Sequence, residues 1–328
     1  MKKLFLIPIM IVLAVILLAA GYAEAKPVVL KAVTFLPTRA FPVICMTKVV
    51  KKVAATAKGE LVVKLLGGPE VIPPPAQVDA VRKNIVQIAL VPMEGYDGLV
   101  PIGHAATLSE LTPAEERASG AYAYMNELHK QAGLFYLERG NAFRRPVTFN
   151  LHTNVRTEKP EDLKGQKLAS STSILDATLQ SFGVSTVIVP NAEFYTSVER
   201  GVADGYVIPI TNSVRMQLYE VTKYVIQPGI LRGGLAFIVN LGAWNGLPPN
   251  LQKILMDAAI DATNEYMNEV EGAMNKMFKK GEDGGMKIIT WSPSDAERFR
   301  KKLYEIGWED YTKKHPNISA KLRPMLSK

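Results

Sequence analysis

The feature that most constrains the fold is an alternation of short apolar runs with helix-length amphipathic segments. Apolar runs at residues 28–35, 61–66 and 88–91 alternate with segments of helical spacing at 42–57 and, after three consecutive prolines, from Ala76 onward. Nearly continuous apolar strands are typical of a sheet covered on both faces, and β-α-β-α-β order is typical of a largely parallel sheet. The first half of the chain therefore predicts an α/β fold.

The same alternation recurs after Arg145-Pro146. Helix-length segments and apolar strand-length runs follow one another, the helices at 175–182 and 193–202 and the strands at 186–189, 206–210 and 235–240. Asp204-Gly205 supplies turn chemistry between two of them. A doubled α/β pattern in 328 residues predicts two lobes of ordinary domain size.

One long helix is predicted after these strands. Pro249 suits a first helical turn, one apolar stripe runs from Leu251 through Val270, and Lys280 is the last residue before Gly281 ends the helix. At ~1.5 Å per residue, about thirty residues span roughly 45 Å. That length exceeds one compact lobe, so we expect the helix to brace both lobes.

The charge distribution argues against a nucleic-acid site. The formal net charge is +8, and most of it lies in residues 276–328, where 13 basic and 7 acidic side chains fall on helix-like segments. A solvated helix face explains that pattern, so we expect no nucleic-acid partner. The single cysteine, Cys45, excludes an intramolecular disulfide framework and a cysteine-rich zinc site, and its apolar neighbours predict a buried side chain.

The N-terminus has the pattern of an export signal. Two lysines precede an apolar run at residues 4–20, and an Ala-Glu-Ala motif ending at Ala25 supplies the small residues that a signal peptidase reads. We expect residues 1–25 to be a signal peptide that is cleaved after Ala25 and leaves a periplasmic protein. The apolar run also lies at the lower limit for a membrane span, so an uncleaved anchor is the competing interpretation.

No catalytic or metal-binding constellation is visible in the sequence. The histidines are far apart, and the chain has no Gly-x-Ser-x-Gly elbow, phosphate loop or Gly-x-Gly-x-x-Gly fingerprint. Glu115 and Glu116 are adjacent and do not converge on one helix face, as an acid–base pair requires. We expect no catalytic residue, metal or cofactor. A ligand-binding protein is favoured over the alternative, an exported enzyme with an atypical site.

A series of motifs then covers nearly the whole chain after the signal. The first half carries Thr-Ala-Lys-Gly-Glu-Leu-Val-Val at 56–63, Gly-Gly-Pro-Glu-Val at 67–71 and Gln-Val-Asp-Ala-Val-Arg at 77–82. The second half carries Lys-Pro-Glu-Asp-Leu-Lys-Gly-Gln-Lys-Leu at 159–168, Glu193-x-Tyr195, Val-x-Arg-Gly-Val-Ala-Asp-Gly at 198–205, Tyr-Glu-Val-x-Lys-Tyr at 219–224 and Trp244-x-x-Leu247-Pro248. In this order the motifs resemble the periplasmic solute-binding proteins of TRAP transporters, of the dicarboxylate-binding type.

This resemblance implies a two-lobed α/β fold of the periplasmic-binding-protein kind, with two hinge strands near Arg145 and Gly234 and a long bracing helix. It implies that the lobes, 26–146 plus 234–274 and 147–233 plus 275–328, close on a small-molecule solute. The solute is then delivered to the membrane permease subunits of a sodium- or proton-coupled TRAP transporter. A periplasmic sensor module is an alternative role that the sequence does not separate from transport.

Three positions depart from the family pattern. Members usually carry an Arg that pairs with the solute carboxylate directly after the Gly-x-Lys-hydrophobic motif, where this chain has Ala169. An Asn often precedes the Pro that follows the Asp-Gly signature, where this chain has Ile208. A basic residue often starts the second lobe, where this chain has Phe149 and Asn150. The carboxylate clamp of the family is therefore missing at these positions, and the identity of the solute stays open.

Three interpretations of the pocket follow. Either Arg39 or Arg232 replaces the missing cation and holds an organic acid, or the pocket takes a less charged solute between apolar side chains and hydroxyl groups. A serine-rich segment at 170–173 opens a helix, where it either caps the helix or holds an anion through backbone N–H groups. The candidate ligand-binding residues are Arg39, Glu94, Tyr96, Phe149, Asn150, Ala169, Ser171, Thr172, Asn191, Phe194, Ile208 and Arg232.

Overall fold

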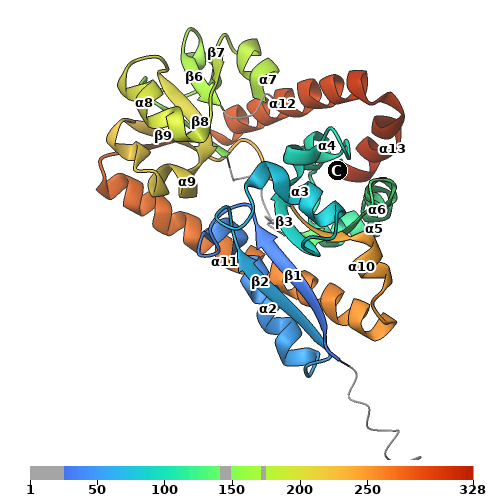
Figure 1. Ribbon diagram of the computed structural model, residues 1–328. Helices are drawn as coiled ribbons and strands as arrows, with labels where there is room; N and C mark the ends of the chain where they lie inside the picture. The colour runs from blue at the N-terminus through green and yellow to red at the C-terminus, as the bar shows by residue number, and fades with distance from the viewer. Residues whose placement is uncertain (1–25, 141–148, 171–174, 328) are drawn as a thin grey trace, which may run out of the picture.

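The computed structural model describes residues 26–140, 149–170 and 175–327, which form two β-sheets surrounded by helices (Figure 1). The expected signal peptide and Arg145 lie outside these residues. The first sheet has the order β2-β1-β3-β10-β4. Its strands are β1 (Val28–Thr34), β2 (Leu61–Gly67), β3 (Ile88–Pro92), β4 (Leu134–Arg139) and β10 (Leu235–Asn240).

The second sheet has the order β11-β9-β5-β8-β6-β7. Its strands are β5 (Phe149–Thr153), β6 (Lys167–Ser170), β7 (Ser185–Ile188), β8 (Gly205–Pro209), β9 (Tyr224–Gln227) and β11 (Lys287–Thr290). Both sheets mix strand directions. β1 runs parallel to β2 and β3, whereas β10 is antiparallel to its two neighbours. Likewise β6 runs parallel to β7 and β8, whereas β5 is antiparallel to β8 and β9.

The chain crosses between the sheets three times. It leaves the first sheet after β4, builds five strands of the second sheet and returns to the first at β10. It then crosses again through α11 (Pro249–Asp283) to β11. This is the two-lobed α/β arrangement that the sequence predicted.

The helix α11 has 35 residues and therefore spans about 52 Å. It contacts α2 (Ile44–Thr56) and β4 on one side and α9 (Ile210–Arg215) and β11 on the other, so the predicted brace between the lobes is confirmed. The helix runs past Gly281, where we expected it to end. A Cβ on Gly281 would come within 2.6 Å of the Met286 side chain, so this glycine permits a close contact instead of ending the helix.

The remaining helices cover the sheets or connect strands. Those beside the first sheet are α3 (Pro74–Arg82), α4 (Gly103–Thr107), α5 (Pro113–Ala118), α6 (Ala121–Gln131) and α10 (Leu241–Asn245). Those beside the second are α7 (Asp176–Ser181), α8 (Phe194–Glu199) and α9. Short 3-10 turns η1 (Phe41–Val43), η2 (Met93–Tyr96), η3 (Pro160–Leu163), η5 (Asn191–Glu193) and η6 (Leu218–Glu220) complete the connections.

Two details differ from the sequence-based expectation. The helix α3 begins at Pro74 rather than at Ala76. The N–H groups of a first helical turn have no intrahelical acceptor, so the N–H that a proline lacks is not needed there. The strand β2 is an edge strand and is covered on one face only. Its Val62 and Leu66 side chains are exposed while Leu61 and Val63 are buried, so this strand alternates instead of being covered on both faces.

The C-terminal helices α12 (Pro293–Lys314) and α13 (Pro316–Leu326) return the chain to the first sheet (Figure 1). α12 contacts α7 beside the second sheet and α4 beside the first, and α13 contacts α4 and α6. The Tyr311 hydroxyl donates a hydrogen bond to the Pro101 carbonyl, and the Glu110 N–H donates to the Leu326 carbonyl at 2.9 Å. In the part of the chain that the structure describes, no helix is both long and apolar enough to cross a membrane.

Candidate functional site

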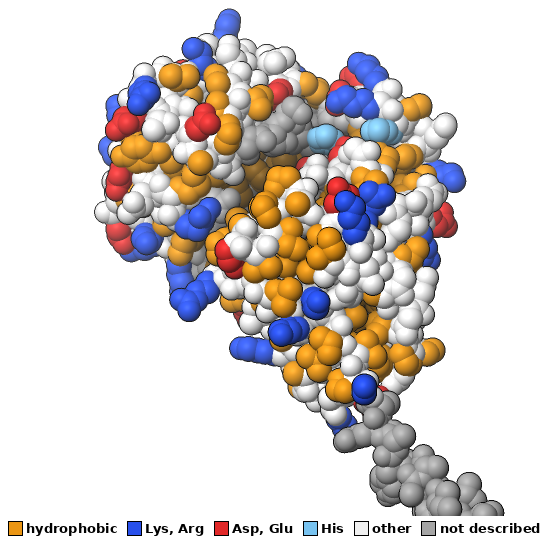
Figure 2. All heavy atoms as spheres, in the orientation of Figure 1, with side chains coloured by type: hydrophobic (Ala, Val, Ile, Leu, Met, Phe, Trp, Pro, Cys, Tyr) orange, Lys and Arg blue, Asp and Glu red, His pale blue; other side chains and the backbone are white. Residues whose placement is uncertain are grey.

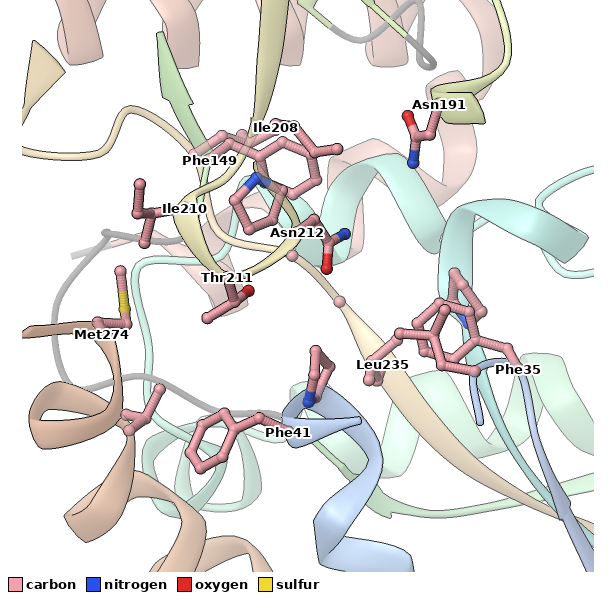
Figure 3. Close-up of a pocket in the computed structure, with 18 of the residues that line it drawn as sticks. Phe35, Phe41, Phe149, Asn191, Ile208, Ile210, Thr211, Asn212, Leu235 and Met274 are labelled. Carbon is pink, nitrogen blue, oxygen red and sulfur yellow. The ribbon is translucent and has the colours of Figure 1, made fainter. Parts of the chain in front are cut away.

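A cavity of about 310 Å³ lies between the two sheets (Figure 3). The first sheet contributes residues that follow the carboxyl ends of β1 and β3, and the second contributes the end of β8 and the first turn of α9. Ligands of open α/β sheets bind at this edge, because loops that follow parallel strands meet there. The described lining residues are Phe35, Leu36, Phe41, Pro42, Pro92, Glu94, Phe149, Asn191, Ile208, Pro209, Ile210, Thr211, Asn212, Leu231, Gly233, Gly234, Leu235, Tyr266, Val270 and Met274.

Most of this lining is aromatic or aliphatic. Phe149 and Ile208 face the cavity from the second sheet, and Phe35 and Leu235 face it from the first (Figure 3). The long helix adds apolar residues, and its Tyr266 ring lies 5.0 Å from the ring of Phe41. Figure 2 shows a hollow between the two halves of the molecule, with apolar side chains beside it. Such a lining favours a solute with an apolar body.

A few polar side chains interrupt the apolar lining. Glu94 and Asn191 come from η2 and η5, and Thr211 and Asn212 come from α9. Among the described lining residues, Glu94 is the single charged side chain. Burial in this apolar surrounding raises the pKa of Glu94 to about 7. The Asn191 Oδ1 atom is buried and accepts no hydrogen bond.

Four of the residues predicted from the sequence come together in this cavity. Glu94 follows β3, Phe149 starts β5, Asn191 lies in η5 and Ile208 lies near the end of β8. They belong to segments that are far apart in the sequence. The structure therefore brings together one acidic, one amide and two apolar candidates.

The two candidate replacement cations do not line the cavity. Arg39 is exposed on the turn after β1. Arg232 lies between two lining residues, Leu231 and Gly233, but its own side chain is buried elsewhere. Its Nη1 group donates to the carbonyl oxygens of Ser109 at 3.2 Å and Leu111 at 3.0 Å. This guanidinium therefore binds the α4–α5 connection, and its burial lowers its pKa.

Ala169 also lies outside the cavity lining. It is fully buried in β6 and pairs with Tyr206 on β8. Phe194, Tyr206 and Ile208 pack with it in one apolar cluster. The Tyr206 ring stacks on His152 at 4.6 Å, and its hydroxyl shares a 2.9 Å hydrogen bond with Ser213. Aromatic rings thus pack in the cluster around Ala169, and Ile208 belongs both to this cluster and to the cavity lining.

Two further candidates have structural partners. The Tyr96 hydroxyl is buried and lies 3.1 Å from Nε2 of His129. Asn150 is buried next to Phe149, and its amide donates to the Ile226 carbonyl at 3.0 Å. Neither residue is among the described lining of the cavity. The remaining candidates, Ser171 and Thr172, lie outside the described residues.

The sequence reasoning missed most of the apolar lining. Phe35 and Phe41 lie in the connection after β1, and Met274 continues the stripe of Tyr266 and Val270 at four-residue spacing on α11. That spacing is a visible signal, but it indicates burial in the same way for a core contact as for a cavity wall.

A buried ionic cluster lies outside the cavity lining. Arg139 on β4 pairs with Glu116 on α5, and Glu138 pairs with Arg117. Glu116 also accepts a 2.8 Å hydrogen bond from the Ser109 hydroxyl. These groups satisfy one another, as buried charges in a stable fold must. Across the described residues, no group of three or more His, Cys, Asp or Glu side chains is placed to hold a metal ion.

This chain is similar in sequence to known solute-binding proteins. The family model of the bacterial extracellular solute-binding proteins, family 7, matches residues 42–314. The 2,3-diketo-L-gulonate-binding periplasmic protein YiaO of Escherichia coli is 26% identical over 239 residues, which cover 71% of this chain and 72% of that protein. A monocarboxylate 2-oxoacid-binding periplasmic protein of Nostoc sp. is 23% identical over 285 residues, which cover 81% and 74%.

The fold is also shared with solved structures. A TRAP periplasmic solute-binding protein from Ochrobactrum anthropi, whose C-terminus is bound in its ligand-binding pocket, superposes with a TM-score of 0.79. The two chains are 20% identical, and the match covers 92% of this chain and 95% of that one. With its two sheets, the cavity between them and the matching family model, this chain belongs to family 7 of the bacterial extracellular solute-binding proteins.

Proposed function

We propose that this protein is a periplasmic receptor that captures one small organic molecule in the interlobe cavity and delivers it to the permease of a TRAP transporter. The observation that supports this best is the cavity itself. It lies between two sheets, where strand ends and the long helix meet, and it is lined mainly by apolar side chains. We further propose that the protein releases its solute unchanged, without chemistry.

The solute is an organic acid or a less charged analogue. The two relatives named above are 2-oxoacid- and diketogulonate-binding proteins, which supports an organic acid as the solute. The described lining of this cavity supports the less charged compound, because it contains a carboxylate and no basic side chain. A charge-assisted Arg–carboxylate bond contributes about 1.5–3 kcal/mol, so its loss weakens binding by roughly tenfold to a hundredfold. We therefore expect succinate, malate and fumarate to bind weakly or not at all.

The two lobes follow the two sheets. We propose residues 26–146 plus 234–274 as the first lobe and 147–233 plus 275–328 as the second, with hinges near Arg145 and Gly234. The contacts of α13 with α4 and α6 tie the end of the second segment to the first lobe. Each sheet keeps its own buried strands, so solute binding closes the hinge without rebuilding either lobe.

The proposed location of the mature protein is the periplasm. We propose that residues 1–25 direct the chain to the periplasm and are removed after Ala25. This agrees with the two relatives above, which are named as periplasmic proteins.

Two measurements test the receptor function. Calorimetric titration of the mature chain with succinate, malate and fumarate should give dissociation constants well above the micromolar range. Small-angle scattering should show a smaller radius of gyration once a bound solute saturates the protein. Submicromolar succinate binding would contradict the proposed solute class, and turnover of a bound compound would contradict the receptor role.

A further inference from the structure

We infer that the cavity selects a solute whose apolar body carries a hydrogen-bond donor, a hydroxyl or a protonated nitrogen, that contacts the Glu94 carboxylate. This inference rests on the proposed receptor function and names the solute class that the receptor takes. It concerns the part of the solute next to Glu94, where a carboxylate would meet a like charge.

The backbone that carries Glu94 is held in place from two sides. Glu94 lies in η2 directly after β3, and the N–H of Met93 donates to the Gly234 carbonyl at 2.9 Å. On the other side Gly103 packs so closely that a Cβ would lie 2.7 Å from the Cα of Glu94. The Gly103 N–H in turn donates to Asp97 Oδ1 at 2.6 Å. A recognition group needs such a rigid support.

The Glu94 carboxylate keeps acceptor positions open toward the cavity. It is half-buried in the cavity wall, and its own backbone N–H donates a hydrogen bond to it. An ionised carboxylate accepts several hydrogen bonds, so this one donor does not saturate it. The nearby charged groups are already engaged, because His104 is paired with Asp97 at 3.0 Å and Arg139 is paired with Glu116. A partly buried carboxylate with unfilled acceptor positions is costly, so a donor on the solute stabilises the complex.

A second polar side chain lies on the other side of the cavity. The side chain of Asn191 reaches toward the cavity with its amide nitrogen (Figure 3), while its Oδ1 atom is buried. Glu94 lies in η2 after a strand of the first sheet, and Asn191 lies in η5 after a strand of the second. A solute hydroxyl that donates to Glu94 and accepts from Asn191 would join the two halves of the cavity, so it would also favour closure.

The body of the solute is constrained by the rest of the lining. Phe35, Phe41 and Phe149 present ring faces or edges, and Ile208 and Met274 present aliphatic surface. The volume of about 310 Å³ lies at the lower end of the range for small-molecule sites. An aromatic or short aliphatic body fits such walls, whereas a sugar acid would leave its hydroxyl groups without partners.

Three compounds with the same apolar body test the inference: 3-phenylpropan-1-amine, 3-phenylpropan-1-ol and 3-phenylpropanoate. Each is titrated calorimetrically at pH 8, where Glu94 is ionised, into the mature chain after removal of any co-purified molecule. We expect the amine and the alcohol to bind at least tenfold more tightly than the acid. Glu94→Gln should weaken amine binding at least tenfold, and the control Glu193→Gln, on the exposed end of η5, should not change it.

A second variant keeps the test independent of Glu94. Asn191→Ala should weaken binding of the alcohol, whose oxygen can accept from the Asn191 amide, while thermal unfolding stays close to that of the parent. Tightest binding by the acid, or an unchanged order of the three compounds in Glu94→Gln, would overturn the inference. If none of the three binds while denatured parent protein releases a small molecule, the inference is overturned and the receptor function stands. If no molecule is released and no solute causes compaction, the receptor function itself is contradicted.

Discussion

Ala169→Arg introduces the arginine that the family resemblance implies at this position, and its effect on the free energy of unfolding follows from the structure. Ala169 and its neighbours Phe194 and Tyr206 are all 0% exposed. Ile208 and Leu218 pack in the same cluster, so aromatic and aliphatic side chains surround them. A guanidinium placed there loses its hydration among apolar side chains, and its extra atoms do not fit beside the rings.

Each of these effects has a known size. An unpaired charge in a protein interior costs several kcal/mol, and overpacking adds about 1–3 kcal/mol. We therefore expect Ala169→Arg to lower the free energy of unfolding by at least about 3 kcal/mol, a large part of the ~5–15 kcal/mol that holds a typical domain together. Ala169→Leu isolates the packing effect and should cost about 1–3 kcal/mol.

Urea unfolding followed by circular dichroism measures these differences. The matched control is Ile188→Arg on the neighbouring strand β7, where the side chain is 54% exposed, and it should change stability by less than about 0.5 kcal/mol. Equal stability of Ala169→Arg and Ile188→Arg would refute the reasoning. It would mean that the space beside Ala169 is open to the cavity and available to a solute.

Three further predictions concern pH, the buried ion pair and export. Burial lowers the pKa of His152 from 6.5 to about 3, so the unfolded chain binds a proton that the folded chain does not, and stability falls as the pH drops below about 6.5. His152→Gln should reduce that slope by up to ~1.4 kcal/mol per pH unit in acid titrations of urea unfolding, and an unchanged slope would contradict the assignment. Glu116→Gln should cost about 3–5 kcal/mol by leaving the Arg139 guanidinium buried without its charge partner, and a loss below 1 kcal/mol in the same assay would count against this. Intact-mass spectrometry of the exported protein should give a chain that starts at Lys26, and a retained N-terminus would favour the membrane anchor.

The sequence predicts the fold well where periodicity is strong. The first strand, the helix after it and the helix α11 all carry long apolar patterns, and each lies close to its expected position. The prediction fails for β2, whose apolar residues run continuously although the strand lies at an edge. Its Val62 and Leu66 are exposed because no element in the described chain covers that face, and position in the sheet is not written in the strand itself.

The site is harder to predict because neighbouring residues point in opposite directions. Phe149 lines the cavity, but Asn150 next to it points to Ile226, since successive side chains of a strand alternate. Leu231 and Gly233 line the cavity while Arg232 between them reaches the α4–α5 connection. A shift of one residue therefore decides whether a candidate contacts the solute, and only the register of the folded chain supplies that information.

The most direct test of the central claim is mass spectrometry of the small molecule released when protein isolated from the periplasm is denatured. The parent protein should release about one organic molecule per chain. Thr211→Trp, which fills the cavity, should release little or none, whereas Arg215→Trp, at an exposed position on the same helix, should release as much as the parent. Equal release by both variants would place the solute outside this cavity and contradict the account.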